Sequence, residues 1–238
     1  MKSCAIHQPH YFPWLGFLNK MASVDRFIFL DEVQIEKGSN MYRNKLCTLA
    51  GQEKHITVAF KKKGCLDIPY NEIQLDNTVD WQQRQVSFIE NNYKACPFFT
   101  EIWDQIHPFF SESFDLLSDA VIRSIEIEMD LFGIKTETIK QSELLYDKSL
   151  KKNELLISLI ESADCDHYLS GNGARKYMEI GEYEDKGITV EYQKFTYPIY
   201  RQGHGFVPNL SALDLLFNCG IDESRNIFWE ELDRNKQR

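Results

Sequence analysis

Two histidines near the start of the chain lie in a segment whose residue types could do chemistry. The segment is HQPHYFPWLGFLNK, residues 7–20, and it places His7 three positions before His10. An imidazole there could donate a hydrogen bond to a phosphate, transfer a proton near neutral pH or bind a metal ion. Pro9 and Pro13 restrict the backbone φ angle, so the loop that carries these groups is expected to be stiff.

The spacing of the two histidines allows two further interpretations. It resembles the HxGH-type signature of nucleotidylyltransferases, which also follows a first strand and opens a helix, although Pro9 stands where that signature has a glycine. The structural alternative is that His7 closes a strand and that Tyr11, Phe12 and Trp14 belong to the core. The structural interpretation is favoured for His10, whereas for His7 the structural and functional interpretations are balanced.

A carboxylate and a cation follow the second apolar run of the chain, FIFLD. In a parallel sheet the Asp31 carboxylate would reach the same crevice as His7, where it could bind Mg²⁺, accept from a ribose hydroxyl or act as a general base. Capping of the next segment is the structural alternative. Arg43 and Asn44 form a later polar cluster, whose guanidinium offers a bidentate fork for phosphate or carboxylate, or else forms a surface ion pair.

Two later loops have compositions that suit a ligand. SGNGARK, residues 170–176, combines two glycines, a serine, an asparagine and two cations at a predicted strand-to-helix turn, although its spacing is not that of a Walker motif. Its candidate ligand contacts are Ser170, Gly171 and Asn172. Tyr200 and Gln202 lie in a glycine-flanked loop, where they suit recognition of a sugar or a base unless the loop is simply surface.

Other polar features have structural explanations. KKKG at 61–64 could meet a phosphate but is more typical of a solvated hairpin tip. Ser211 and Asp214 stand three apart before an apolar run, as in a helix capping box, and Gly220 fits the end of that helix. No serine lies in a G-x-S-x-G turn and no cysteine has a histidine at a telling spacing, so a catalytic triad is not supported. A GxGxxG loop after the first strand is also absent.

The elements that must position these residues begin with a βαβ unit. Residues 3–6 and 27–31 are apolar runs typical of buried strands, and apolar residues recur at helical spacing over Leu15–Ala22 between them. Strand, helix and strand in this order imply a parallel sheet. A further strand is predicted at 54–60, because its residues alternate between polar and apolar.

Helices dominate the middle of the chain, and strands and helices alternate again after it. Helices are predicted at Trp81–Tyr93, 98–110 and 114–132, with Gly133 at the position of a C-cap glycine. The predicted fold class is α/β, a Rossmann-like, mostly parallel sheet with a helical insertion at about 78–132 in a single domain spanning 1–238. The later predicted strands are 136–139, 167–169 and 187–195, and the later helices are 152–163 and 174–180.

The composition and net charge limit the classes of function that this chain can have. The 238 residues are 43% hydrophobic, enough for a substantial core, and carry 27 basic against 36 acidic side chains, a net charge of −9. This balance argues against general nucleic-acid binding but allows a local basic pocket. The six cysteines are too far apart for a zinc or thiol redox motif. With no signal segment or membrane-spanning run, we expect a soluble cytoplasmic protein with reduced thiols.

Taken together, five segments resemble the WbqC-like family of bacterial proteins. They extend from the N-terminus to near Gly220 and therefore cover nearly the whole chain. Members of this family are typically found with genes for O-antigen and other surface polysaccharides, so the resemblance implies a role in lipopolysaccharide biosynthesis. At His10, relatives carry an asparagine, which argues against catalysis by His10. The segments are IHQPHYFPWLGFLNKM, DRFIFLDEVQ, MYRNK, HYLSGNGARKYM and YQKFTYPIYRQGHGFVPNLSALDLLFNCG.

The function expected from the resemblance is a transferase that adds an acyl or aminoacyl group to a nucleotide-linked amino sugar. It needs a nucleotide-linked sugar as partner and an activated acyl or aminoacyl donor, with no metal site assigned. The alternatives are a nucleotidylyltransferase-like adenylating enzyme and a non-catalytic ligand-binding subunit of a polysaccharide assembly complex, and a homo-oligomer is left open. The expected catalytic residues are His7 and Asp31, and the expected substrate-binding residues are Gln8, Tyr11, Trp14, Arg43, Asn44, Ser170, Gly171, Asn172, Tyr200 and Gln202.

Overall fold

A five-stranded parallel sheet organises the computed structural model, which describes residues 2–203 and 205–236. The strand order is β5-β2-β1-β6-β7, so the chain builds outward from β1 on one side and then returns to the other side of β1. Every pair of neighbours is parallel. The predicted α/β class is therefore confirmed, and the sheet is compatible with a Rossmann-like fold. The strands are β1 (Ser3–His7), β2 (Arg26–Phe29), β5 (Glu137–Lys140), β6 (His167–Ser170) and β7 (Thr189–Tyr192).

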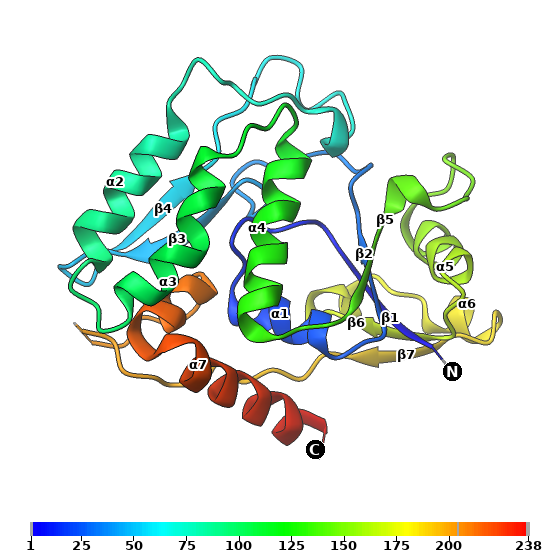
Figure 1. Cartoon of the computed structure of the whole chain (residues 1–238). Coiled ribbons are helices and arrows are strands. Elements are labelled where there is room, and N and C mark those ends of the chain that lie inside the picture. The colour runs from blue at the N-terminus through cyan, green and yellow to red at the C-terminus, as the bar shows by residue number, and fades with distance from the viewer. Residues whose placement is uncertain (1, 204, 237–238) are drawn as a thin grey trace.

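Helices cover both faces of the sheet (Figure 1). Successive strand residues point to opposite faces, so each strand packs against helices on both sides. Ala5 and Phe27 belong to a large core shared with α1, α4 and α7. Cys4 and Ile28 belong to a second cluster shared with α5 and α6. Because both faces of these strands are buried, their sequences are nearly continuously apolar. The helices are α1 (Leu15–Ala22), α4 (Leu117–Phe132), α5 (Lys152–Ser162), α6 (Ile180–Glu184) and α7 (Ala212–Lys236).

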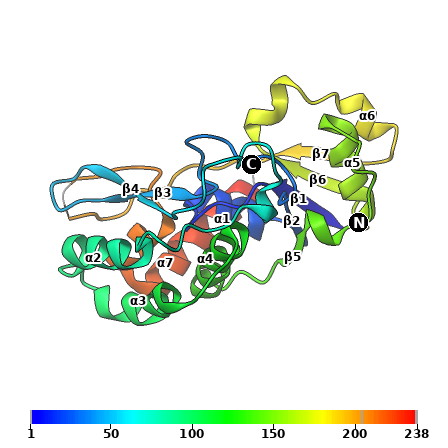
Figure 2. The ribbon, with the colours of Figure 1, turned by 90° about the horizontal axis from the view of Figure 1, so that it is seen from above.

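The long connection from β2 to β5 forms the opposite end of the molecule. It contains an antiparallel hairpin of β3 (Arg43–Cys47) and β4 (Glu53–Thr57), followed by α2 (Trp81–Tyr93), α3 (Phe99–Ile106) and α4. Figures 1 and 2 place the hairpin, α2 and α3 at one end and α5 and α6 at the other, with α1, α4 and α7 between them. That both ends belong to a single domain stays a prediction.

Several predicted helix boundaries are confirmed, and two predicted helices are altered. α1 and α2 have the predicted limits, and α4 ends at Phe132, followed by the left-handed cap Gly133 with φ 71°. The helix predicted over 98–110 stops at Ile106 and continues as a 3₁₀ turn, because Pro108 lacks an N–H and disfavours α geometry in the residue before it.

The helix predicted at 174–180 is wrong. A 3₁₀ helix occupies Asn172–Lys176 instead, and α6 begins only at Ile180. Glycines at 171 and 173 weaken an α-helix start, and the Tyr177 N–H bonds the Ala174 carbonyl three residues back. The strands predicted at 54–60 and 187–195 are shorter in the structure, at Glu53–Thr57 and Thr189–Tyr192.

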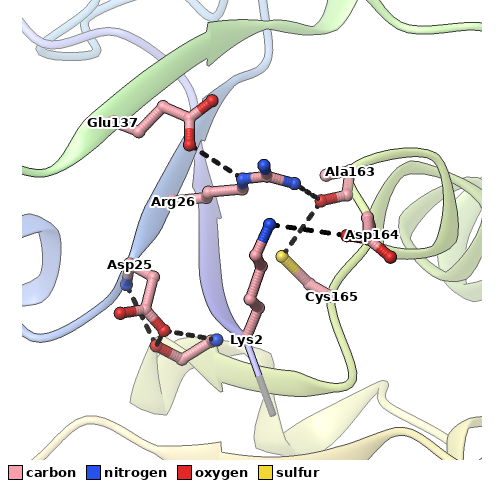
Figure 3. Close-up of polar contacts among 8 residues, drawn as sticks. Lys2, Asp25, Arg26, Glu137, Ala163, Asp164 and Cys165 are labelled. Atoms are coloured by element: carbon pink, nitrogen blue, oxygen red, sulfur yellow. Dashed lines mark hydrogen bonds and ion pairs between the residues drawn. The ribbon is translucent and has the colours of Figure 1, made fainter.

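Ionic contacts hold the amino-terminal edge of the sheet together (Figure 3). Arg26 on β2 donates from Nε to Glu137 on β5 at 2.9 Å and from Nη1 to the Ala163 carbonyl after α5. Lys2 lies 3.4 Å from Asp164 in the same turn. These contacts lie at the amino-terminal ends of the parallel strands. The loops that contain the predicted histidines and glycines follow the carboxyl-terminal ends of the strands.

Candidate functional site

The carboxyl ends of β1 and β6 form the candidate site. The strand order reverses between these two strands, since β1 leads to β2 on one side and β6 lies on the other. Such a switch point in an open parallel sheet leaves a crevice where ligands bind. His7 is the last residue of β1 and Ser170 the last residue of β6, so two of the predicted site residues flank this point.

The His7 imidazole is half-buried and its tautomer is defined by one contact. Its Nδ1 lies 2.9 Å from the Gln8 carbonyl oxygen, which can only accept, so Nδ1 carries the hydrogen. The Nε2 lone pair therefore remains available, and it has no hydrogen-bond partner among the described residues. Burial and then the positive charge of Lys20 lower the pKa of His7 to about 4, so the ring is neutral at pH 7.

His10 packs beside His7 and is also half-buried. The two rings meet edge to face with centroids 4.7 Å apart, and His10 stacks on Phe17 of α1 at 5.0 Å. The Nδ1 atom of His10 is buried without a hydrogen-bond partner. Burial, His7 and Lys20 all lower its pKa. His10 is therefore a second neutral imidazole that supports the His7 ring.

Lys20 is a buried cation that sequence reasoning missed. Its Nζ donates to the Ile6 carbonyl of β1 at 2.8 Å, and only 3% of the residue is exposed. Desolvation lowers its pKa to about 8. Residues 15–21 of α1 are all buried, so the helix leaves no solvent-facing side at Lys20. The signal in the sequence is a single charged residue, Lys20, in a short and mostly apolar helix.

The loop after β6 approaches Lys20 from the other strand. A Cβ placed on Gly171 would lie 4.0 Å from the Lys20 Nζ, so glycine leaves space next to the ammonium group. Ser170 is fully buried, with its hydroxyl 3.2 Å from the Met178 sulfur. Asn172 is exposed and donates to the Gln193 carbonyl at 2.7 Å. Of these three predicted residues, Gly171 is thus placed next to the Lys20 ammonium group.

Gln193 connects the site to α1. It follows β7, and its Nε2 donates to the Gly16 carbonyl at 2.8 Å and to Asn19 Oδ1 at 3.0 Å. This amide holds α1 against the ends of β6 and β7. Lys20, one residue beyond Asn19, is thereby fixed beneath the Gly171 loop.

Gln8 and Asp31 lie beyond His7 but have partners of their own. Gln8 donates from Nε2 to Glu36 at 3.2 Å. Asp31 is buried and accepts from the Ser142 N–H at 2.9 Å and the Ser142 hydroxyl at 2.6 Å, with Asn71 at 3.5 Å. Its carboxylate therefore joins the loop after β2 to the 3₁₀ turn after β5.

The rest of the opening loop turns into the core. Tyr11 is fully buried, and its hydroxyl donates to Gln85 on α2 at 2.8 Å. Phe12 adopts φ +35°, a conformation that L residues rarely take, and its carbonyl accepts from buried Asn44 at 2.7 Å. Trp14 covers Gly16 so closely that a Cβ there would lie 2.2 Å from the indole. Tyr11 and Asn44 thus hold the loop that carries His7.

Tyr200 and Gln202 gather around a different carboxylate, Asp214. The Tyr200 hydroxyl and the Gln202 amide donate to Asp214 Oδ2 at 2.8 and 2.9 Å, and Tyr93 donates to Oδ1 at 2.7 Å. Asp214 is 1% exposed. The predicted cap is found at Ser211, whose hydroxyl accepts from the Leu213 N–H at 3.3 Å. Capping therefore does not account for Asp214, which on α7 binds Tyr200, Gln202 and, from α2, Tyr93.

Arg43 lies at the start of β3, away from β1 and β6 in sequence and in strand pairing. Its Nη2 donates to the Gly38 carbonyl at 2.8 Å, and its guanidinium lies 5.8 Å from the Tyr42 ring centroid. Among the described residues, no group of three or more metal-ligating side chains is placed to hold an ion. Within the same residues, no helix is long and apolar enough to cross a membrane.

Comparison with known proteins gives two matches. A profile of the WbqC-like protein family matches residues 8–226. An uncharacterized protein of Mycobacterium tuberculosis, Rv1507c, is 33% identical over 230 residues, which are 93% of this chain and 96% of that protein. No solved structure matches.

Proposed function

We propose that this chain, which belongs to the WbqC-like protein family, transfers an acyl or aminoacyl group to the amino group of a nucleotide-linked sugar. The proposed role is in bacterial surface-polysaccharide biosynthesis in the cytoplasm. One observation carries the reaction type: at the switch point of the sheet, His7 presents an unprotonated Nε2 of defined tautomer beside the buried cation Lys20. A base and a nearby positive charge are the two groups that acyl transfer to an amine requires.

In the proposed step, the sugar nitrogen attacks the acyl carbonyl carbon. A C–N bond forms, the bond from that carbon to the leaving group of the donor breaks, and His7 Nε2 takes the proton released by the nitrogen. The imidazolium then returns the proton to the leaving group. The Nδ1–H bond to the Gln8 carbonyl keeps the ring in the orientation that this exchange needs.

The charge of Lys20 is proposed to favour negative charge at the site. Its ammonium lies against the Gly171 loop, where no Cβ separates it from a ligand. The same charge lowers the pKa of the free His7. An anionic substrate next to Lys20 would offset that effect and raise the proton affinity of His7 when the base is needed. The catalytic role of Asp31 stays a prediction, and its oxygens already accept hydrogen bonds from Ser142.

The test is an assay with a panel of nucleotide-linked amino sugars and acyl or aminoacyl donors, with products identified by mass spectrometry. His7→Asn retains a donor near the Nδ1 position but removes the Nε2 base, so kcat should fall by about 10²–10⁴-fold. His107→Asn is the matched control, because His107 is an exposed histidine outside the site. Absence of turnover with every pair, or equal kcat in the wild type and His7→Asn, would contradict the proposal.

A second candidate is adenylation by a nucleotidylyltransferase-like reaction. The observation that favours it is the direct contact of His7 and His10 at the end of the first strand, with ring centroids 4.7 Å apart. This activity would release pyrophosphate from ATP in the presence of Mg²⁺. A phosphate-detection assay on the same two variants distinguishes it from acyl transfer.

A further inference from the structure

A large cavity lies away from the switch point, between β4 and α2. Its volume is about 730 Å³, within the range of small-molecule sites. We call it the β4–α2 groove. Its lining includes the aromatic residues Tyr42, Phe60, Trp81 and Phe88 and the cations Lys54, Lys62 and Arg84.

The aromatic residues give the groove flat apolar walls. Tyr42 and Phe60 meet edge to face with centroids 5.1 Å apart. Phe88 lies on the α2 side with the Lys54 ammonium 5.6 Å from its ring centroid. Every nucleobase has a π face that can stack on such rings, whatever the base.

The cations of the groove are unpaired. Among the described residues, Lys54, Lys62 and Arg84 form no ion pair with a carboxylate, and all three are exposed. The one acidic side chain in the lining, Asp76, already accepts from the Thr78 N–H and hydroxyl at 3.2 and 2.5 Å. In a chain of net charge −9, three uncompensated cations around one cavity indicate an anionic occupant.

An added β-strand is the main competing occupant, because within the described part of the chain β4 pairs with β3 alone and leaves its other edge open. That edge is interrupted, since Gln85 on α2 donates to the Thr57 carbonyl at 3.0 Å. An RNA or DNA strand is disfavoured by the overall negative charge. A small anion with a planar ring fits both the aromatic walls and the cations.

We propose that the β4–α2 groove binds a nucleoside diphosphate group, with the base against the aromatic walls and the two phosphates near Arg84, Lys54 and Lys62. The group would come either from a nucleotide-linked sugar or from a nucleotide carrier of an acyl group such as coenzyme A. The inference does not require the transferase reaction, because a binding site can exist without turnover.

A second cavity extends the groove toward the switch point. It measures about 360 Å³, shares Tyr42, Phe60 and Lys62 with the groove, and is lined also by Glu36. Glu36 accepts the hydrogen bond from Gln8, the residue after His7. A bound nucleotide in the groove would therefore direct its attached group along this side of the protein toward His7.

Titration calorimetry of the full chain tests the site with UDP, ADP, UDP-N-acetylglucosamine, coenzyme A and inorganic pyrophosphate. Saturable binding of at least one nucleoside diphosphate is expected, and Phe88→Ala should weaken it by about fivefold or more. Arg84→Gln, at an exposed position where misfolding is not expected, should weaken it similarly. Lys135→Gln, which removes an exposed charge elsewhere, should leave the Kd unchanged. Tighter binding of the sugar nucleotide or of coenzyme A identifies the source.

Three results would overturn the inference. These are no saturable binding of any nucleoside diphosphate, binding that Arg84→Gln and Phe88→Ala do not weaken, and pyrophosphate binding as tightly as the nucleotides. His7→Asn separates this inference from the proposed function, because it should abolish turnover while nucleotide binding in the groove persists. Loss of binding in the groove variants without any detectable turnover would support the groove and contradict the transferase.

Discussion

At the scale of single residues, the candidate site depends on two groups that burial holds in unusual protonation states. His7 stays neutral because protonation would place a second charge near Lys20 in a desolvated place. Among the described residues, the Lys20 ammonium group has one hydrogen-bond partner, the Ile6 carbonyl. Perturbed groups of this kind in a crevice are characteristic of functional sites.

The buried charge of Lys20 should lower the free energy of unfolding. Replacing it by methionine removes a buried ammonium that has one hydrogen bond, so Lys20→Met should raise the free energy of unfolding at pH 7 by about 1–3 kcal/mol. Denaturant unfolding followed by circular dichroism measures this change. Lys135→Met, at an exposed position, is the control. The same variant should raise the pKa of His7, measured by NMR titration of the ring, and a less stable Lys20→Met would contradict the assignment.

At the scale of elements, local sequence patterns predicted most helices. They failed where tertiary contacts determine the secondary structure. α1 and α2 have the predicted limits because their apolar residues recur at helical spacing. β3 was not predicted, because RNKLC is largely polar and its buried Asn44 depends on a distant partner, the Phe12 carbonyl. The helix at 174–180 was wrong because a glycine-containing 3₁₀ turn replaces its first part.

The start of α1 depends on a glycine under an indole. A methyl group at position 16 would meet the Trp14 ring at 2.2 Å, so Gly16→Ala should lower the free energy of unfolding by about 1–3 kcal/mol through overpacking. Gly181→Ala in α6 is the matched control, because its Cβ would meet no atom within 4 Å. Thermal unfolding of both variants measures the difference. Equal stability of the two variants would show that Trp14 can move aside freely.

At the scale of the whole molecule, the predicted site residues fall into separate groups. His7 and Gly171 each lie near Lys20 at the switch point of the sheet. Tyr200 and Gln202 converge on Asp214 at the base of α7. Tyr11 and Asn44 lie in the core. The predicted homo-oligomer and cytoplasmic location stay predictions.

Global stability should fall in weak acid because of the buried histidines. The folded pKa of His7 is about 4 against an ordinary value of 6.5, so the unfolded state takes up the proton first as pH falls. The stabilisation is fully present above pH 6.5 and is lost between about pH 6.5 and 4. For His7 it amounts to at most about 3 kcal/mol.

Urea unfolding at several pH values measures this loss. His7→Asn should show a shallower decline than the wild type, whereas His107→Asn should follow the wild type. Identical pH profiles for His7→Asn and the wild type would mean that His7 titrates alike in both states.

The sequence by itself determined the α/β class, the strand that ends at His7 and the glycine loop after Ser170. Periodicity, turn chemistry and residue type act over a few neighbouring positions, so these features can be inferred locally. Only the tertiary structure decided which side chains are buried and paired. Asp31 meets Ser142 across 111 residues and Tyr93 meets Asp214 across 121.

The same reason explains why Lys20 and the β4–α2 groove emerged only from the fold. Strand order places the Gly171 loop over Lys20, and the hairpin and α2 enclose the groove. Burial and charge compensation are properties of the packed chain, and no local pattern encodes them.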